Sequence, residues 1–245
     1  MNTPLSYSVT QWKDHTWQHI DDSVSPEEPV YVSWPGSSCR LWAWPDDLEP
    51  LCVGHALLDR LHLGPEAGPS PVRMSGSVRT ISIPPGIDAK HAFAVELRRE
   101  GERGNDTTPS IVMTPEAIVE TMNTFLTLEG TCPLLWESTG CFHRAGMFDP
   151  RTGTFLRLAG WACLNGIDPA DSVLFVSARI TSSLYAKARR AGFSFLISRS
   201  AVTSTPVEMA REQNRRHPAH PVTLLGFCRP KEGRFTVFAG EGRIV

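Results

Sequence analysis

Short apolar runs alternate with amphipathic segments in the last third of the chain. Three runs rich in β-forming residues, 172–177, 193–197 and 222–227, predict buried strands. The segments between them carry helix signals: 181–190 has an apolar face, and 205–213 opens with a cap residue followed by proline. Strands that alternate with helices through short connections are typical of a parallel sheet. We therefore expect an α/β domain in this part of the chain.

Two hairpins are predicted further upstream. Segments 30–34 and 39–44 flank the turn sequence Pro-Gly-Ser-Ser, and segments 142–148 and 154–158 flank Asp-Pro-Arg-Thr-Gly. In each case two apolar segments approach a sequence that favours a turn. Both pairs therefore predict antiparallel strands.

A polar, glycine-containing stretch over residues 98–109 predicts a boundary between two lobes. Before it, hairpin and strand signals mix with one helix signal. We expect a flexible tail over residues 1–28, a smaller mixed α+β lobe over 29–108, and the main α/β domain over 109–245. A helix that begins after Thr114 opens this main domain.

The ends of the three predicted parallel strands are rich in hydroxyl and guanidinium groups. In α/β sheets, ligands bind beyond the carboxyl ends of the strands. Together with amides at helix N-termini, such groups form an anion site, and phosphate is the natural candidate. The same side chains can instead cap helices and face water, and the pattern leaves both interpretations open. The residues concerned are Ser177, Arg179, Ser198, Ser200, Thr203 and Arg229.

The amino-acid composition limits the kinds of partner and the cellular location that we expect. The chain has 245 residues and a formal net charge of −2, so nothing indicates a nucleic-acid polymer as partner. The N-terminal residues lack the apolar core of a signal peptide, and no apolar run approaches the length needed to span a membrane. We expect a cytoplasmic protein.

The cysteines are scattered and form no C-x-x-C pair. In a cytoplasmic chain they are expected to be reduced thiols. His217 and His220 have the spacing of metal ligands, but no partner pair of cysteines or histidines accompanies them, so zinc is not indicated. The six cysteines are Cys39, Cys52, Cys132, Cys141, Cys163 and Cys228.

From about residue 29 to the C-terminus, the chain resembles the FdhD/NarQ family of formate dehydrogenase accessory sulfurtransferases. No single piece is specific, whereas the order and spacing of the pieces are. The matching pieces are 29–54 with its hairpin, Ser138-Thr-Gly-Cys-Phe-His143, Val176-Ser-Ala-Arg179, Ala191-Gly192, Ser200-Ala-Val-Thr203 and Leu225-Gly-Phe-Cys-Arg229 leading to Gly233-Arg-Phe235.

The resemblance implies a three-layer αβα main domain similar to cytidine deaminases and a homodimer. It also implies binding of the bis-molybdopterin guanine dinucleotide form of the molybdenum cofactor, with GDP as a mimic. The family passes sulfur from a cysteine desulfurase to this cofactor for an apo formate dehydrogenase. Besides the strand-end residues, the expected cofactor-binding residues are Thr139, Gly140, His143, Cys228, Arg229, Pro230, Gly233, Arg234 and Phe235, with Lys231-Glu232 as an apparent insertion.

Two departures from the family pattern bear on chemistry. The C-x-x-C loop that carries the persulfide is missing, and no cysteine occurs between residues 84 and 130. The family's D-V-G-R-H-N-A-x-D-K segment is replaced by the shorter and chemically different stretch 158–166. Sulfur relay needs a thiolate that accepts sulfur and hands it on. The sequence therefore favours a non-catalytic accessory protein, although it leaves the question of an enzyme open.

Four functions differ in the residues that they require. We favour a chaperone that holds the molybdenum cofactor for a formate dehydrogenase or a related molybdoenzyme. The alternative is a sulfurtransferase in which Cys141 or Cys132 replaces the lost loop, with His143 as the neighbour that could activate Cys141. A zinc deaminase is excluded because its H-x-E or C-x-E and P-C-x-x-C motifs are absent. A purely structural interaction module would bind no ligand.

Overall fold

The structure is a computed structural model that describes residues 4–60, 72–102, 111–128, 143–156 and 158–245. These residues group into two compact units. The first is built from described residues within Met1–Leu48 and Thr80–Ala94, and the second from those within Glu49–Arg79, Val95–Leu128 and His143–Val245.

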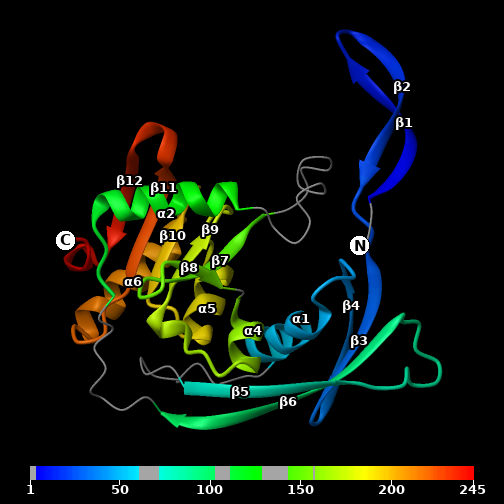
Figure 1. Cartoon of the computed structure of the whole chain (residues 1–245), viewed down its shortest axis with the longest axis horizontal. Coiled ribbons are helices and arrows are strands. Elements are labelled where there is room, and N and C mark those ends of the chain that lie inside the picture. Colours follow the sequence, from blue (N-terminus) through cyan, green and yellow to red (C-terminus); the bar gives the residue numbers. More distant parts are fainter. Residues whose placement is uncertain (1–3, 61–71, 103–110, 129–142, 157) are drawn as a thin grey trace. The chain divides into compact units, whose positions relative to one another are not determined.

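A six-stranded mixed sheet forms the centre of the second unit (Figure 1). Strand β10 pairs in parallel with β9 on one side and β11 on the other, as the sequence predicts. Strands β12 and β7 pair antiparallel with β11 and β9, and β8 completes the predicted hairpin with β7. In spatial order the strands are β12 (Arg234–Ala239), β11 (Thr223–Arg229), β10 (Phe195–Ser198), β9 (Val173–Val176), β7 (Ala145–Asp149) and β8 (Thr154–Leu156).

Helices cover both faces of this sheet. On one face, α2 (Pro115–Thr127) packs Ile118, Met122 and Phe125 against a core that includes Phe175. The other face carries α4 (Ala159–Leu164), α5 (Ser182–Ala191) and α6 (Ser204–Arg216). Because a strand points successive side chains to opposite faces, the fully buried strands β9 and β10 supply both cores. Helices on both sides of a sheet give three layers, as expected.

Local sequence explains where these helices begin and end. The hydroxyl of Thr114 accepts a hydrogen bond from the Ala117 amide, and that of Thr181 accepts one from the Leu184 amide. Helix α5 ends at Gly192, whose φ of 106° is in the left-handed region that favours glycine. Short helical turns complete the unit: η1 (Ala56–Arg60), η2 (Pro169–Asp171), η3 (Pro230–Glu232) and η4 (Glu241–Arg243).

The first unit contains the predicted hairpin of residues 30–44. Strand β3 (Glu28–Trp34) pairs antiparallel with β4 (Ser37–Ala43) and parallel with the beginning of β6 (His91–Glu102). The strand order of this sheet is β4-β3-β6-β5, and β5 (Val72–Thr80) up to Arg79 and β6 from Val95 onward group with the second unit.

The N-terminal residues differ from the expected tail. Strands β1 (Leu5–Lys13) and β2 (Thr16–Val24) form an antiparallel hairpin. Leu5, Tyr7 and Val9 alternate with polar residues in the way that a strand requires. Asp14 and His15, both at positive φ, close a tight two-residue turn that neither an Asn-Gly nor an Asp-Gly pair announces.

The limits of the two units also differ from the predicted lobes at 29–108 and 109–245. Helix α1 (Leu48–His55) groups with the C-terminal elements because α4 approaches it closely. A Cβ atom on Gly160 would lie 1.9 Å from the carbonyl oxygen of Pro50 and 2.7 Å from the amide nitrogen of Gly54. Only glycine permits this contact between the two helices. Helices long and apolar enough for a membrane span are absent from the described residues.

Gly160→Ala is expected to destabilise the protein by about 1–3 kcal/mol or more, because the added methyl group meets backbone atoms that cannot rotate away. Urea unfolding followed by circular dichroism measures the change. Gly242→Ala is the matched control, since a Cβ atom there has no heavy atom within 4 Å, and less than about 0.5 kcal/mol is expected. Equal midpoints for both variants would contradict the close packing of α1 and α4.

Candidate functional site

A crevice of about 700 Å³ lies at the carboxyl ends of β9, β10 and β11. Its walls come from the residues that follow these strands and from His143, which precedes β7. Guanidinium groups dominate the polar lining, and one carboxylate and one aromatic ring join them. The lining residues are His143, Arg179, Arg199, Ser200, Ala201, Phe227, Arg229 and Glu232.

Three serines connect the ends of β9 and β10 through hydrogen bonds, and the arginines beside them face the crevice. The Ser177 hydroxyl accepts from the Arg144 amide at 2.7 Å. Ser198 donates to the carbonyl of Ala178 at 2.7 Å and accepts from the Ser200 amide at 2.8 Å. Ser200 donates to the carbonyl of Ser177 at 2.7 Å. Ser177 and Ser198 are buried, so their hydroxyls build the crevice and do not line it.

A β-bulge decides which side chains of β11 reach the crevice. The register shifts between Gly226 and Arg229, and Phe227 has a φ of 50°. Its amide donates to the carbonyl of Ser200 at 2.8 Å. Such bulges re-aim side chains. Here the ring of Phe227 lines the crevice, and Cys228 takes the inward position beside Leu225.

Cys228 is thereby excluded from the crevice, contrary to the placement expected from the sequence. Its side chain is fully buried in the core under α2. Burial raises the pKa of this thiol to about 12. A neutral thiol surrounded by apolar side chains packs as a small hydrophobic group.

The segment that follows β11 holds a carboxylate between two arginines. Arg229 Nη1 donates to Glu232 Oε1 at 3.1 Å, and Arg234 Nε donates to Glu232 Oε2. Gly233, at a φ of 62°, turns the chain back into β12. Phe235 packs against the core under α2. Arg229 is the one residue of the predicted cofactor segment that lines the crevice. Glu232, which was not predicted, also lines it.

Arg179 and Arg199 are the most available cations of the crevice. Both side chains are exposed, and neither guanidinium has a hydrogen bond or ion pair with any residue that the structure describes. Arg229, in contrast, is shared between Glu232 and the ring of Phe227, 5.7 Å away. The crevice thus offers two unpaired guanidinium groups to an anion.

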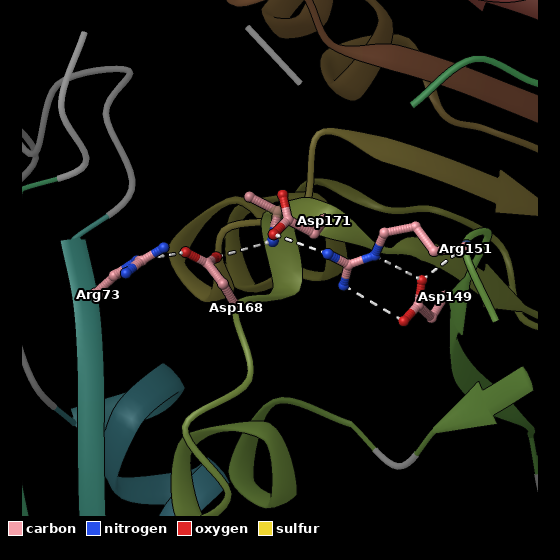
Figure 2. A network of polar contacts seen from close by, with 6 residues as sticks. Arg73, Asp149, Arg151, Asp168 and Asp171 are labelled. Carbon is pink, nitrogen blue, oxygen red and sulfur yellow. Dashed lines mark hydrogen bonds and ion pairs between the residues drawn. The ribbon is translucent and has the colours of Figure 1, made fainter. Parts of the chain in front are cut away.

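A second cavity of about 550 Å³ lies in the same unit, and two of its arginines are engaged in ion pairs. These arginines, Arg73 and Arg151, pair with carboxylates (Figure 2). Arg73 Nε lies 3.0 Å from Asp168 Oδ2, and Arg151 bridges Asp149 at 3.1 Å and Asp171 at 3.9 Å. Hydrogen bonds from Arg151 offset desolvation and lower the pKa of Asp149. These mutual pairs make the second cavity a weaker candidate for a charged ligand.

The structure places the sequence-predicted site residues in three groups. His143, Arg179, Ser200 and Arg229 come together in the crevice. Thr203 lies at the start of α6 beyond it, exposed, and its hydroxyl donates to the carbonyl of Ile180 at 3.4 Å. Pro230 opens the η3 turn. Thr139, Gly140, Cys141 and Cys132 lie outside the described residues.

Sequence reasoning missed Arg199, Phe227 and Glu232. Arg199 stands between two predicted serines, so the strand-end position itself could have indicated it. Glu232 falls in the pair Lys231-Glu232, which the family resemblance treats as an insertion. Among the described residues, no group of three or more His, Cys, Asp or Glu side chains gathers as a metal site would require.

Comparison with known proteins decides the family. A model of the FdhD/NarQ family matches residues 25–245. The chain belongs to this family. It is 31% identical to Protein FdhD of Methanocaldococcus jannaschii over 121 residues, which are 44% of this chain and 49% of the relative. It is also 31% identical to Sulfur carrier protein FdhD of Bacillus subtilis over 145 residues, 55% of this chain and 50% of that protein.

These alignments span about half the length of the curated relatives. A crystal structure described as a formate dehydrogenase accessory protein from Desulfotalea psychrophila has the same fold over the full length of both chains, with a TM-score of 0.69 and 17% identity. At this identity the likeness concerns the fold alone.

The buried thiols give a direct test of the geometry. Iodoacetamide reacts with thiolates, and burial raises the pKa of Cys163 to about 11 and of Cys228 to about 12. At pH 8 only about one in a thousand Cys163 thiols and one in ten thousand Cys228 thiols would be ionised. We expect mass spectrometry of the native protein to show both unlabelled while the urea-unfolded protein is labelled throughout. Rapid native labelling of Cys228 would place its side chain back in the crevice.

Proposed function

We propose that the protein is an accessory protein that binds the bis-molybdopterin guanine dinucleotide form of the molybdenum cofactor in the strand-end crevice. It then presents the cofactor to an apo formate dehydrogenase or a related molybdoenzyme. One observation carries this proposal. The guanidinium groups of Arg179 and Arg199, which have no partner among the described residues, line a crevice at the ends of three parallel strands.

The residues of the crevice fit the nucleotide arm of this cofactor. A volume of about 700 Å³ lies within the range of about 300–1,000 Å³ usual for small-molecule sites. Arginine is suited to phosphate because its planar guanidinium donates two parallel hydrogen bonds. Arg179 and Arg199 would hold the diphosphate, and His143 adds a third donor at the rim. When bound, the cofactor supplies the molybdenum chemistry of the client enzyme.

Several further expectations belong to the same proposal. Family membership supports a role in formate dehydrogenase maturation. The homodimer, the cytoplasmic location, the cysteine desulfurase as a partner and the likeness to cytidine deaminases stay predictions. So does the expectation that zinc is not a cofactor.

Sulfur transfer is the alternative, and the Bacillus subtilis relative is named a sulfur carrier protein. It would need an accessible thiolate. Cys163 and Cys228 are buried with raised pKa values, and no C-x-x-C pair occurs in the sequence. Cys52 is buried as well, and Cys39 is half-buried in β4. The alternative drawn from the sequence assigns sulfur transfer to Cys141 or Cys132.

GDP is expected to bind the wild-type protein at micromolar concentration and to compete with the cofactor. Arg179→Ala and Arg199→Ala should each weaken GDP binding by about 1.5–3 kcal/mol, the range for a hydrogen bond to a charged group. Isothermal titration calorimetry measures these changes. Arg216→Ala is the control, because this arginine lies in the last turn of α6, is paired with Glu212 and does not line the crevice. Unchanged affinity in both crevice variants would move the site elsewhere.

The sulfurtransferase alternative makes a different prediction. After incubation with a cysteine desulfurase and cysteine, mass spectrometry should detect no stable persulfide on the protein. Formate dehydrogenase maturation should stay near normal with Cys132→Ser, Cys141→Ser and the double variant. Loss of maturation in Cys141→Ser, with GDP binding intact, would instead establish sulfur transfer through that thiol.

A further inference from the structure

Glu232 is the one carboxylate among the residues that line the crevice in the described part of the chain. It ends the η3 turn between β11 and β12. Its side chain is about half exposed. A negative charge in a crevice lined by three arginines weakens the attraction of the crevice for phosphate, so its presence calls for another role.

The carboxylate is oriented but retains capacity to accept hydrogen bonds. Oε1 accepts from Arg229 Nη1 at 3.1 Å, and Oε2 accepts from Arg234 Nε. An ionised carboxylate offers about four acceptor positions over its two oxygens. Hydrogen bonds from Arg234 and then Arg229 lower the pKa of Glu232, so the group is charged at neutral pH. One acceptor position on each oxygen therefore remains for a ligand.

An aromatic surface lies in the same wall. The ring of Phe227 lines the crevice, and the guanidinium of Arg229, the partner of Glu232, lies 5.7 Å from its centroid. The left-handed backbone of Phe227 holds the ring in this place, and bulky residues rarely adopt that conformation. Aromatic rings and guanidinium groups are the surfaces on which nucleic-acid bases stack.

We infer that Glu232 selects guanine as the base of the bound nucleotide. Its two oxygens accept hydrogen bonds from the N1–H and the 2-amino group of guanine, and the Phe227–Arg229 surface supports the plane of the base. Adenine presents an unprotonated N1 at that edge, which a carboxylate repels. Hypoxanthine keeps N1–H but lacks the 2-amino group. This inference rests on the proposed function, in which Arg179 and Arg199 hold the diphosphate.

The test compares GDP, IDP and ADP in calorimetric titrations of the wild type, Glu232→Gln and Glu232→Ala. The wild type should bind GDP about tenfold or more tightly than IDP, because one hydrogen bond to a charged group is lost, and should bind ADP more weakly still. Both variants should bind GDP and IDP with nearly equal affinity. Glu208→Gln, an exposed glutamate of α6 that does not line the crevice, should keep the wild-type order. Thermal unfolding checks that each variant is folded.

Three other results would overturn the inference, and they are distinguishable. If Glu232→Ala binds GDP, IDP and ADP more tightly by one common factor, Glu232 only competes with phosphate for Arg229 and Arg234. If it keeps the wild-type preference for GDP, the base is read elsewhere, and the proposed function stands without Glu232. If the wild type binds none of the three nucleotides, the proposed function itself fails.

Discussion

The parallel register of β9, β10 and β11 is the constraint on which the rest of the second unit depends. Every residue of β9 and β10 is buried, since α2 covers one face of the sheet and α4, α5 and α6 cover the other. Strands enclosed in this way cannot place polar groups along their length. Chemistry is therefore confined to the strand ends, where the register brings residues 177–179, 198–201 and 227–229 side by side.

Two local features convert this edge into a crevice. Hydrogen bonds among Ser177, Ser198 and Ser200 hold the ends of β9 and β10 at a fixed distance from each other. The bulge at Phe227 then turns one aromatic ring outward and one thiol inward. The serines act as scaffold and the arginines as contact groups, although the two residue types look equally suited to a ligand in the sequence.

Much of this architecture could be predicted because it follows from periodicity and caps. The strands and helices between residues 172 and 229, the hairpin of β7 and β8, and the cap at Thr114 are confirmed. The bulge could not be predicted, since a strand with an uninterrupted period of two places Phe227, and not Cys228, beside Leu225. A phenylalanine at positive φ has no signal in the sequence. The contact of Gly160 with Pro50 is equally invisible, because it joins segments 110 residues apart.

Family membership and the geometry of the crevice are independent observations, and both support the proposed function. The family match extends over residues 25–245, whereas the crevice is lined by a few side chains, of which Arg179 and Arg199 have no partner among the described residues. The proposed function assigns the cationic strand edge to cofactor binding, whereas sulfur relay would need an accessible thiolate, and the sequence has no C-x-x-C pair. The two capacities are separable because they depend on different residues.

A crystal structure of the protein with bound GDP tests the central claim most directly. The account predicts electron density for the diphosphate between Arg179 and Arg199 at the carboxyl ends of β9 and β10, with the backbone of the three strands unchanged. Density for the nucleotide in the second cavity, beside Arg73 and Arg151, or an empty strand-end crevice at saturating GDP would contradict it.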